Sequence, residues 1–181
     1  MARKKKIPTI SLTPAGVAAR ITGARSVVLV AIVLTIVNLA LLFAGKDQIL
    51  FSVALSYYGV VAGLIQDNLA VAEDAALRVG PYTVAALILS AVLLVLLAVS
   101  FFRIKKSRSW TLAVMVGFIV DAVLLAPVSI LMLNNPSYVV VDLCIHVWVV
   151  VLMAMGVYAW NQQALLDAEE KGQDAPGEDE A

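Results

Sequence analysis

Four long apolar blocks constrain what this chain of 181 residues can fold into. A membrane with a hydrocarbon core about 30 Å thick is crossed by a helix of about 20 residues, and each block is of about that length. Only 14% of the residues are charged, whereas soluble domains are about one quarter charged. The sequence therefore predicts an all-α, polytopic membrane protein built as a bundle of four transmembrane helices. The predicted spans cover residues 26–44, 81–102, 110–133 and 138–160.

Basic residues are distributed unevenly among the connections between these spans. Six of the thirteen Lys and Arg residues precede residue 26, and four lie within residues 103–108. The first connection holds only Lys46 and Arg78. Because cytoplasmic loops are enriched in Lys and Arg, we expect both termini to be cytoplasmic. The chain then divides into a basic N-terminal segment, a membrane domain and an acidic tail, at residues 1–25, 26–160 and 161–181.

The N-terminal segment contains a helix-start signal. Threonine is favoured at the N-cap and proline at the first helical position, and Thr13 and Pro14 follow this order. Residues 15–25 are therefore expected either as a short helix that runs into the first span, or as a disordered basic tail attracted to anionic lipid.

The first external connection contains a further apolar stretch, residues 48–66, within an unusual segment that extends to residue 79. A fifth crossing there would move the basic loop at residues 103–108 to the outside, against the charge rule. We therefore expect an apolar helical segment that lies in the interface, re-enters the membrane or packs on the bundle. Tyr57 and Tyr58 would suit a headgroup boundary, and residues 67–79 are expected to form a short amphipathic helix.

Small residues within this segment share one face of a helix. They are spaced by four, three and four positions, and such faces let membrane helices approach closely. The pattern predicts docking onto the chain's own bundle, with a dimer contact as the alternative. The residues of this candidate packing face are Ser52, Ser56, Gly59 and Gly63.

Four polar residues within the predicted spans form a candidate site: Asn38, Asp121, Asp142 and His146. Asp142 and His146 are four residues apart and share a helix face. Counted at the helical rise, Asp121 lies about one turn deeper than His146 and within its reach. Polar groups in hydrocarbon are costly and therefore suggest a function. Two interpretations stay open, a network that fixes helix packing or a cluster that relays a proton or binds a cation.

Signals for other chemistry are absent from the sequence. It contains no G-x-S-x-G motif, no glycine-rich phosphate loop and no nucleic-acid-binding module. One His and two Asp fall short of the ligand set of a structural zinc site. We therefore expect no enzymatic activity, no metal and no cofactor. The expected partners are the lipid bilayer and either a second copy of the chain or another membrane protein, and no nucleic acid.

Aromatic and polar residues in three places carry a resemblance to other proteins. These are Leu50-Phe51-Ser52 with Tyr57 and Tyr58, Trp110 with Phe118-Ile119-Val120-Asp121, and Asp142-Leu143-Cys144-Ile145-His146-Val147-Trp148. Over about residues 26–160, the chain resembles a group of small four-span membrane proteins of unknown function from Gram-positive bacteria. The resemblance implies a shared fold, a shared orientation and a bacterial plasma membrane, and it implies no activity. The acidic tail and the alanine- and valine-rich helices depart from that group.

These observations lead to one functional expectation and one alternative. We expect an integral plasma-membrane protein that acts as a structural or interaction component of a membrane assembly. The alternative is a small proton- or cation-linked transporter that uses the intramembrane Asp/His cluster.

Overall fold

Five helices make up the described part of the chain. The computed structural model describes residues 12–46, 51–69, 78–131 and 136–173, with side chains except at 126–131, 136–139 and 171–173. Four of the helices are long and apolar enough to cross a membrane, which confirms the predicted fold class. The helices are α1 (Pro14–Phe43), α2 (Ala54–Asn68), α3 (Pro81–Arg103), α4 (Arg108–Leu131) and α5 (Pro136–Gln173).

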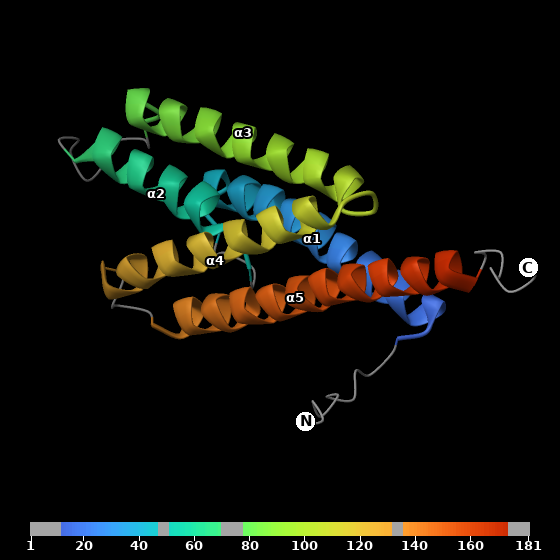
Figure 1. Ribbon diagram of the computed structural model, residues 1–181. Helices are drawn as coiled ribbons and strands as arrows, with labels where there is room; N and C mark the ends of the chain where they lie inside the picture. The colour runs from blue at the N-terminus through green and yellow to red at the C-terminus, as the bar shows by residue number, and fades with distance from the viewer. Residues whose placement is uncertain (1–11, 47–50, 70–77, 132–135, 174–181) are drawn as a thin grey trace, which may run out of the picture.

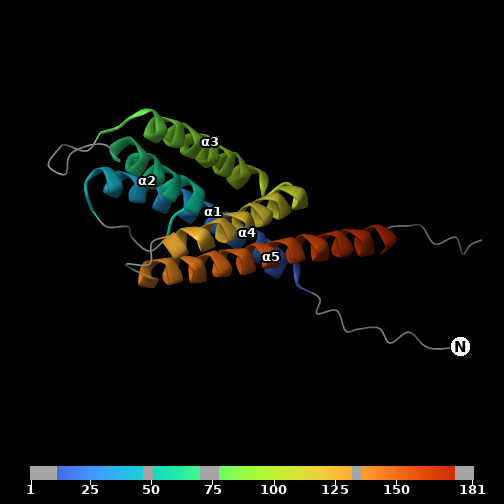
Figure 2. The same cartoon turned by 90° about the vertical axis from the view of Figure 1, so that its left-hand side faces the viewer.

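The four long helices form an elongated bundle, with α1 and α4 between α3 on one side and α5 on the other (Figures 1 and 2). The start of α1, the turn between α3 and α4, and the end of α5 lie at one end of the bundle, which we call the tail end. The opposite end, where α3 begins and α4 ends, is called the loop end. This arrangement fits four crossings with both termini on one side.

In the structure, a helix starts at the position that Thr13 and Pro14 predict. The side-chain oxygen of Thr13 accepts a hydrogen bond from the backbone N–H of Gly16 at 3.2 Å, and Pro14 is the first residue of α1. The helix then continues without a break to Phe43. Of the two expectations for residues 15–25, the structure therefore has the helix.

Apolar side chains cover the outside of the bundle, and polar side chains lie inside it. Helix α3 shows this best, because its buried residues are Thr83, Ser90 and Ser100. Many of its apolar residues, in contrast, face outward, with Val95 at 61% and Phe102 at 65% exposure. An outer surface of this kind is costly in water and natural in lipid. The arrangement supports contact with a lipid bilayer.

Helix α2 is a half-length helix inserted into the loop-end half of the bundle. Its 15 residues span about 22 Å at the helical rise. Its first residues lie beside Asp121, near the middle of the 24-residue α4, and it packs mainly along α3 (Figure 1). The apolar stretch of the first connection therefore packs within the bundle from mid-height outward.

Of two expectations for the first connection, one is wrong, and the other falls largely outside the residues that the structure describes. Tyr57 and Tyr58 are buried in the bundle, at 7% and 8% exposure, because α2 is enclosed by its neighbours; they do not face a headgroup boundary. The short helix expected over residues 67–79 is described only at its ends, since residues 70–77 lie outside the described ranges. Asp67 and Asn68 belong to the last turn of α2.

Candidate functional site

The chain enters α2 through a short buried segment, Phe51 to Val53, whose backbone is bonded by polar side chains of α1. The side-chain amide of Asn38 donates to the carbonyl oxygen of Phe51 at 2.7 Å. The hydroxyl of Thr35 accepts from the backbone N–H of Val53 at 2.9 Å. Irregular backbone in a membrane bundle must find its partners within the protein, since lipid offers none. Thr35 and Asn38, one turn apart on α1, supply them.

Asp121 of α4 caps the N-terminus of α2 from across the bundle. Its Oδ2 accepts from the backbone N–H of Ala54 at 2.8 Å, and its Oδ1 accepts from that of Leu55 at 2.9 Å. Val53, the residue in the N-cap position, makes no side-chain cap of its own. The first N–H groups of a helix lack intrahelical partners, and the helix dipole favours negative charge there. Asp121 therefore meets both needs of α2 at mid-height in the bundle.

His146 of α5 links Asp121 to Asp142. Its Nε2 lies 2.9 Å from Oδ2 of Asp121, and its Nδ1 lies 2.9 Å from the backbone carbonyl oxygen of Asp142. A carbonyl oxygen only accepts, so Nδ1 carries a proton. The Nε2–Oδ2 contact then needs one more proton, either on Nε2 as an imidazolium or on the carboxyl of Asp121. The pair shares a proton in both cases.

Asp142 makes longer contacts on the same layer. Its Oδ1 lies 3.4 Å from Nδ1 of His146, and its Oδ2 lies 3.5 Å from the hydroxyl of Tyr58. Both distances are longer than the usual range for a hydrogen bond. Asp142, His146 and Asn38 are each fully buried. Four elements, α1, α2, α4 and α5, therefore meet in one layer of polar groups.

The structure brings all four sequence-predicted cluster residues into this layer. Asn38 reaches it indirectly, because its amide bonds Phe51, whose ring lies 4.8 Å from the His146 ring centre to centre. Among the described residues, no group of three His, Cys, Asp or Glu side chains has the geometry to hold a metal ion.

Of the four residues of the candidate packing face, Ser56, Gly59 and Gly63 belong to α2, whereas Ser52 lies in the segment before the helix. Three of the four are covered within the chain. Ser52, Ser56 and Gly63 are buried, and a Cβ atom at Gly63 would lie 2.9 Å from backbone atoms of Thr83. The hydroxyl of Ser90 donates to the carbonyl oxygen of Ser56 at 3.0 Å. Gly59 differs, because a Cβ there would meet nothing within 4 Å.

A second carboxylate, Asp67, caps the following helix in the same manner. It accepts from the backbone N–H groups of Gly80 at 2.9 Å, Tyr82 at 3.2 Å and Thr83 at 2.8 Å, and from the Thr83 hydroxyl. Gly80 occupies the N-cap position of α3 and has no side chain to cap it. Burial raises the pKa of Asp67, but these four hydrogen bonds outweigh it and hold the pKa below its ordinary value of 3.8.

Sequence reasoning missed three residues of these networks. Thr35 lies one turn before Asn38, so a search for polar pairs on one face of the first span could have found it. Asp67 precedes Gly80-Pro81, a helix start without a capping side chain, by 13 residues. The contact of Tyr58 with Asp142 depends on the path of α2, which no local pattern encodes.

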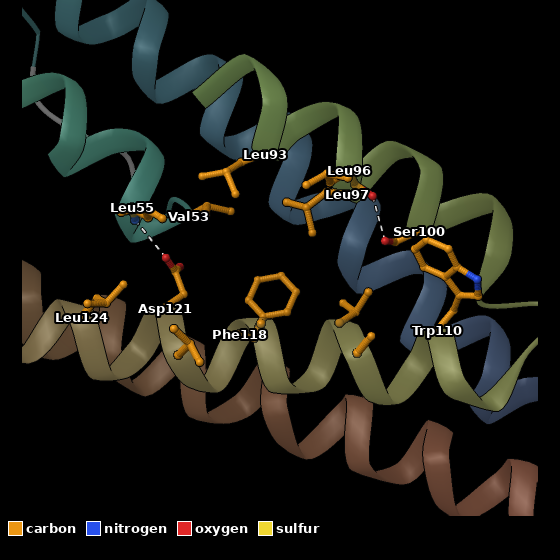
Figure 3. A pocket seen from close by; sticks show the side chains of 14 residues that line it. Val53, Leu55, Leu93, Leu96, Leu97, Ser100, Trp110, Phe118, Asp121 and Leu124 are labelled. Atoms are coloured by element: carbon orange, nitrogen blue, oxygen red, sulfur yellow. Dashed lines mark hydrogen bonds between the residues drawn. The ribbon is translucent and has the colours of Figure 1, made fainter. Parts of the chain in front are cut away.

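An apolar groove runs from Asp121 toward the tail end, between α3 and α4 (Figure 3). Its volume is about 420 Å³. Asp121 and Leu55 lie at one end of it, and Ser100 and Trp110 at the other. The remaining lining residues are apolar, apart from Gly117, which has no side chain.

Comparisons of the chain with protein-family models, with curated proteins and with solved structures find no match. The class that the fold defines is a polytopic helical membrane protein with four candidate spans. Its distinguishing feature is a half-length helix, seated at mid-height by an Asp–His pair.

Proposed function

We propose that this protein is a structural or interaction component of a membrane assembly, with no enzymatic activity, and that its Asp/His layer holds α2 in the bundle. One observation carries the proposal. Both oxygens of Asp121 are engaged in seating α2, and Oδ2 also contacts His146. A carboxylate committed to backbone N–H groups is poorly suited to exchange a substrate.

The surroundings of the layer support the same role. The segment from Phe51 to Val53 is buried in protein, and the groove that Val53 lines is apolar apart from Asp121 and Ser100. Hydrogen bonds between membrane helices contribute on average only about 0.6 kcal/mol each. Several of them on one layer would therefore specify where α2 sits more than they would stabilise the bundle. A partner would bind an outward apolar face, since Ser52, Ser56 and Gly63 are covered.

The thermal stability of the purified protein in detergent tests the structural role of the cluster. Asp121→Asn, Asp142→Asn and His146→Gln are compared with the parent and with Val123→Thr, a change on the outer face of α4 where Val123 is 65% exposed. Breaking a satisfied buried network leaves groups unpaired and destabilises, by about 1–3 kcal/mol for each. We expect the three cluster variants to melt lower than the control. Unchanged or higher melting temperatures would contradict the proposal, because removing a strained functional group tends to stabilise a protein.

The interaction role has a separate test. Cross-linking in native membranes, followed by mild solubilisation, should recover the protein with a second copy or with another membrane protein. Recovery of the monomer alone would contradict the interaction role and leave the structural role of the cluster to the melting experiment.

A second candidate is a small proton- or cation-linked transporter. It is favoured by the proton that Nε2 of His146 shares with Asp121, and by the position of Asp121 at the end of the groove. Tyr58, Asp142, His146 and Asp121 would form the relay. The test is proton and cation flux into vesicles that hold the reconstituted protein, at several pH values. Flux above that of empty vesicles, lost in His146→Gln, would favour this candidate; flux at the background would exclude it.

The location belongs to the proposal as well. We place the protein in a bacterial plasma membrane, and the basic residues of the N-terminal segment and of residues 103–108 support an orientation there with both termini in the cytoplasm. The resemblance to four-span proteins of Gram-positive bacteria supports the same membrane.

A further inference from the structure

The groove between α3 and α4 exists because α2 separates these helices in only half of the bundle. In the loop-end half, α2 fills the space between α3 and α4 (Figure 1). In the tail-end half, the described chain leaves a space of about 420 Å³, lined by Leu93, Leu97 and Phe118 among others (Figure 3). An unfilled apolar space loses the contacts of the atoms that line it. In a bilayer, the hydrocarbon chains of lipids surround this groove and can fill it.

The length of the groove matches one leaflet of the bilayer. Between Trp110 and Asp121, which lie at the two ends of the groove, the helical rise along α4 gives about 16 Å. One leaflet of the hydrocarbon core is about 15 Å thick. The groove is therefore long enough for a single acyl chain that enters from the tail end, and its far end stops at Leu55 and Asp121.

The charges at the entrance indicate the headgroup. Trp110 lines the tail end of the groove, and the turn that joins α3 to α4 lies just beyond this end. This turn and the adjoining helix ends carry four exposed basic side chains and no acidic one. Basic clusters at the membrane surface bind anionic lipid headgroups. The four residues are Arg103, Lys105, Lys106 and Arg108.

From this combination we propose that the α3–α4 groove binds one acyl chain of an anionic phospholipid, whose phosphate lies against the basic turn. The bound chain covers the edge of Asp121, which is 6% exposed, and the side chain of Leu55. It thereby keeps water from the contacts of Asp121 with the first N–H groups of α2. The lipid is a structural ligand that completes the packing of the bundle.

The full-length protein in detergent provides the test, with phosphatidylglycerol and phosphatidylcholine of the same acyl chains as probes. We expect native mass spectrometry to retain one phosphatidylglycerol, and this lipid to raise the melting temperature more than phosphatidylcholine does. Ala113→Leu places a larger side chain in the groove and should lower retention at least tenfold. Ala91→Leu, at an exposed position of α3 outside the groove, should bind as the parent does. Equal retention of the two lipids by the parent, or full retention by Ala113→Leu, would overturn the proposal.

The charge at the entrance is tested by the double variant Lys105→Gln/Lys106→Gln, beside Arg78→Gln at the loop end. The first should lose the preference for phosphatidylglycerol, and the second should keep it.

A spectroscopic measurement covers the case in which a groove variant fails to fold. In Trp148→Phe/Trp160→Phe, Trp110 is the remaining tryptophan of the chain. Phosphatidylglycerol with brominated acyl chains should quench its fluorescence at lower concentration than brominated phosphatidylcholine does. Equal quenching by the two lipids would count against the proposal.

Discussion

At Gly63, helices α2 and α3 approach so closely that the position has no room for a side chain. A Cβ atom there would lie 2.9 Å from the backbone nitrogen and Cα of Thr83 and from the carbonyl oxygen of Tyr82. Backbone atoms cannot move aside as a flexible side chain can. Gly63→Ala should therefore destabilise the protein by about 1–3 kcal/mol, as overpacking usually does.

Gly59 offers a matched control on the same helix. A Cβ there meets nothing within 4 Å, and alanine has a higher helix propensity than glycine. Gly59→Ala should leave the melting temperature unchanged or raise it. If Gly63→Ala melts like Gly59→Ala, the close approach of α2 and α3 is contradicted.

A substitution of Thr35 tests whether its hydroxyl is the hydrogen-bond partner of the backbone in the segment before α2. Thr35→Val keeps the shape of the side chain but removes the oxygen that accepts from the N–H of Val53. This leaves a buried donor unpaired, at a cost of about 1–3 kcal/mol. The melting temperature should fall, whereas Thr22→Val, at an exposed position of α1, should have little effect. Equal melting of the two variants would indicate that Val53 finds another partner.

Helices α2 and α3 share one feature, an N-terminus that is capped by a side chain of another helix. Each begins at a residue without a capping side chain, Val53 or Gly80, and each receives a carboxylate from another helix. Asp121 caps α2, and Asp67 of α2 caps α3. The start of each helix therefore depends on its neighbour being in place, and we expect α2 and α3 to form cooperatively with α4.

These caps, which come from other helices, mark the limit between what the sequence could predict and what it could not. The four long helices were predictable, because the length of an apolar block is a local property. The Asp121–His146 contact could be expected from depth, since the helical rise places Asp121 about one turn deeper than His146 and within its reach. The position of α2 could not, because its N-terminal partners, Thr35 and Asp121, come from two other helices. The cap that Asp67 makes on α3 could not be predicted for the same reason, and the sequence placed Asp67 only within the amphipathic helix expected over residues 67–79.

Acid should loosen the junction of α2 and α3. The pKa of Asp67 is lowered in the folded protein, so its carboxylate contributes stability above its ordinary pKa of 3.8. That contribution is lost as the pH falls below this value through the lower folded pKa. Between about pH 5 and pH 2, the parent should lose more thermal stability than Asp67→Asn, which carries no carboxylate there. Parallel melting curves over this range would contradict the cap.

At the scale of the whole molecule, the position of α2 decides on which side each connection lies. With α2 packed inside the bundle, we expect the chain to cross four times, which would place Ala44 and Ser109 on opposite sides. Two single-cysteine variants test this after the lone Cys144 is replaced by alanine. Ala44→Cys and Ser109→Cys are both at exposed positions, near the loop end and the tail end.

The basic turn next to Ser109 favours the cytoplasmic side, so a membrane-impermeant maleimide should label Ala44→Cys in intact bacterial cells. Ser109→Cys should react only after the cells are permeabilised. Labelling of both in intact cells would mean that α2 crosses the membrane, and the reverse pattern would invert the orientation.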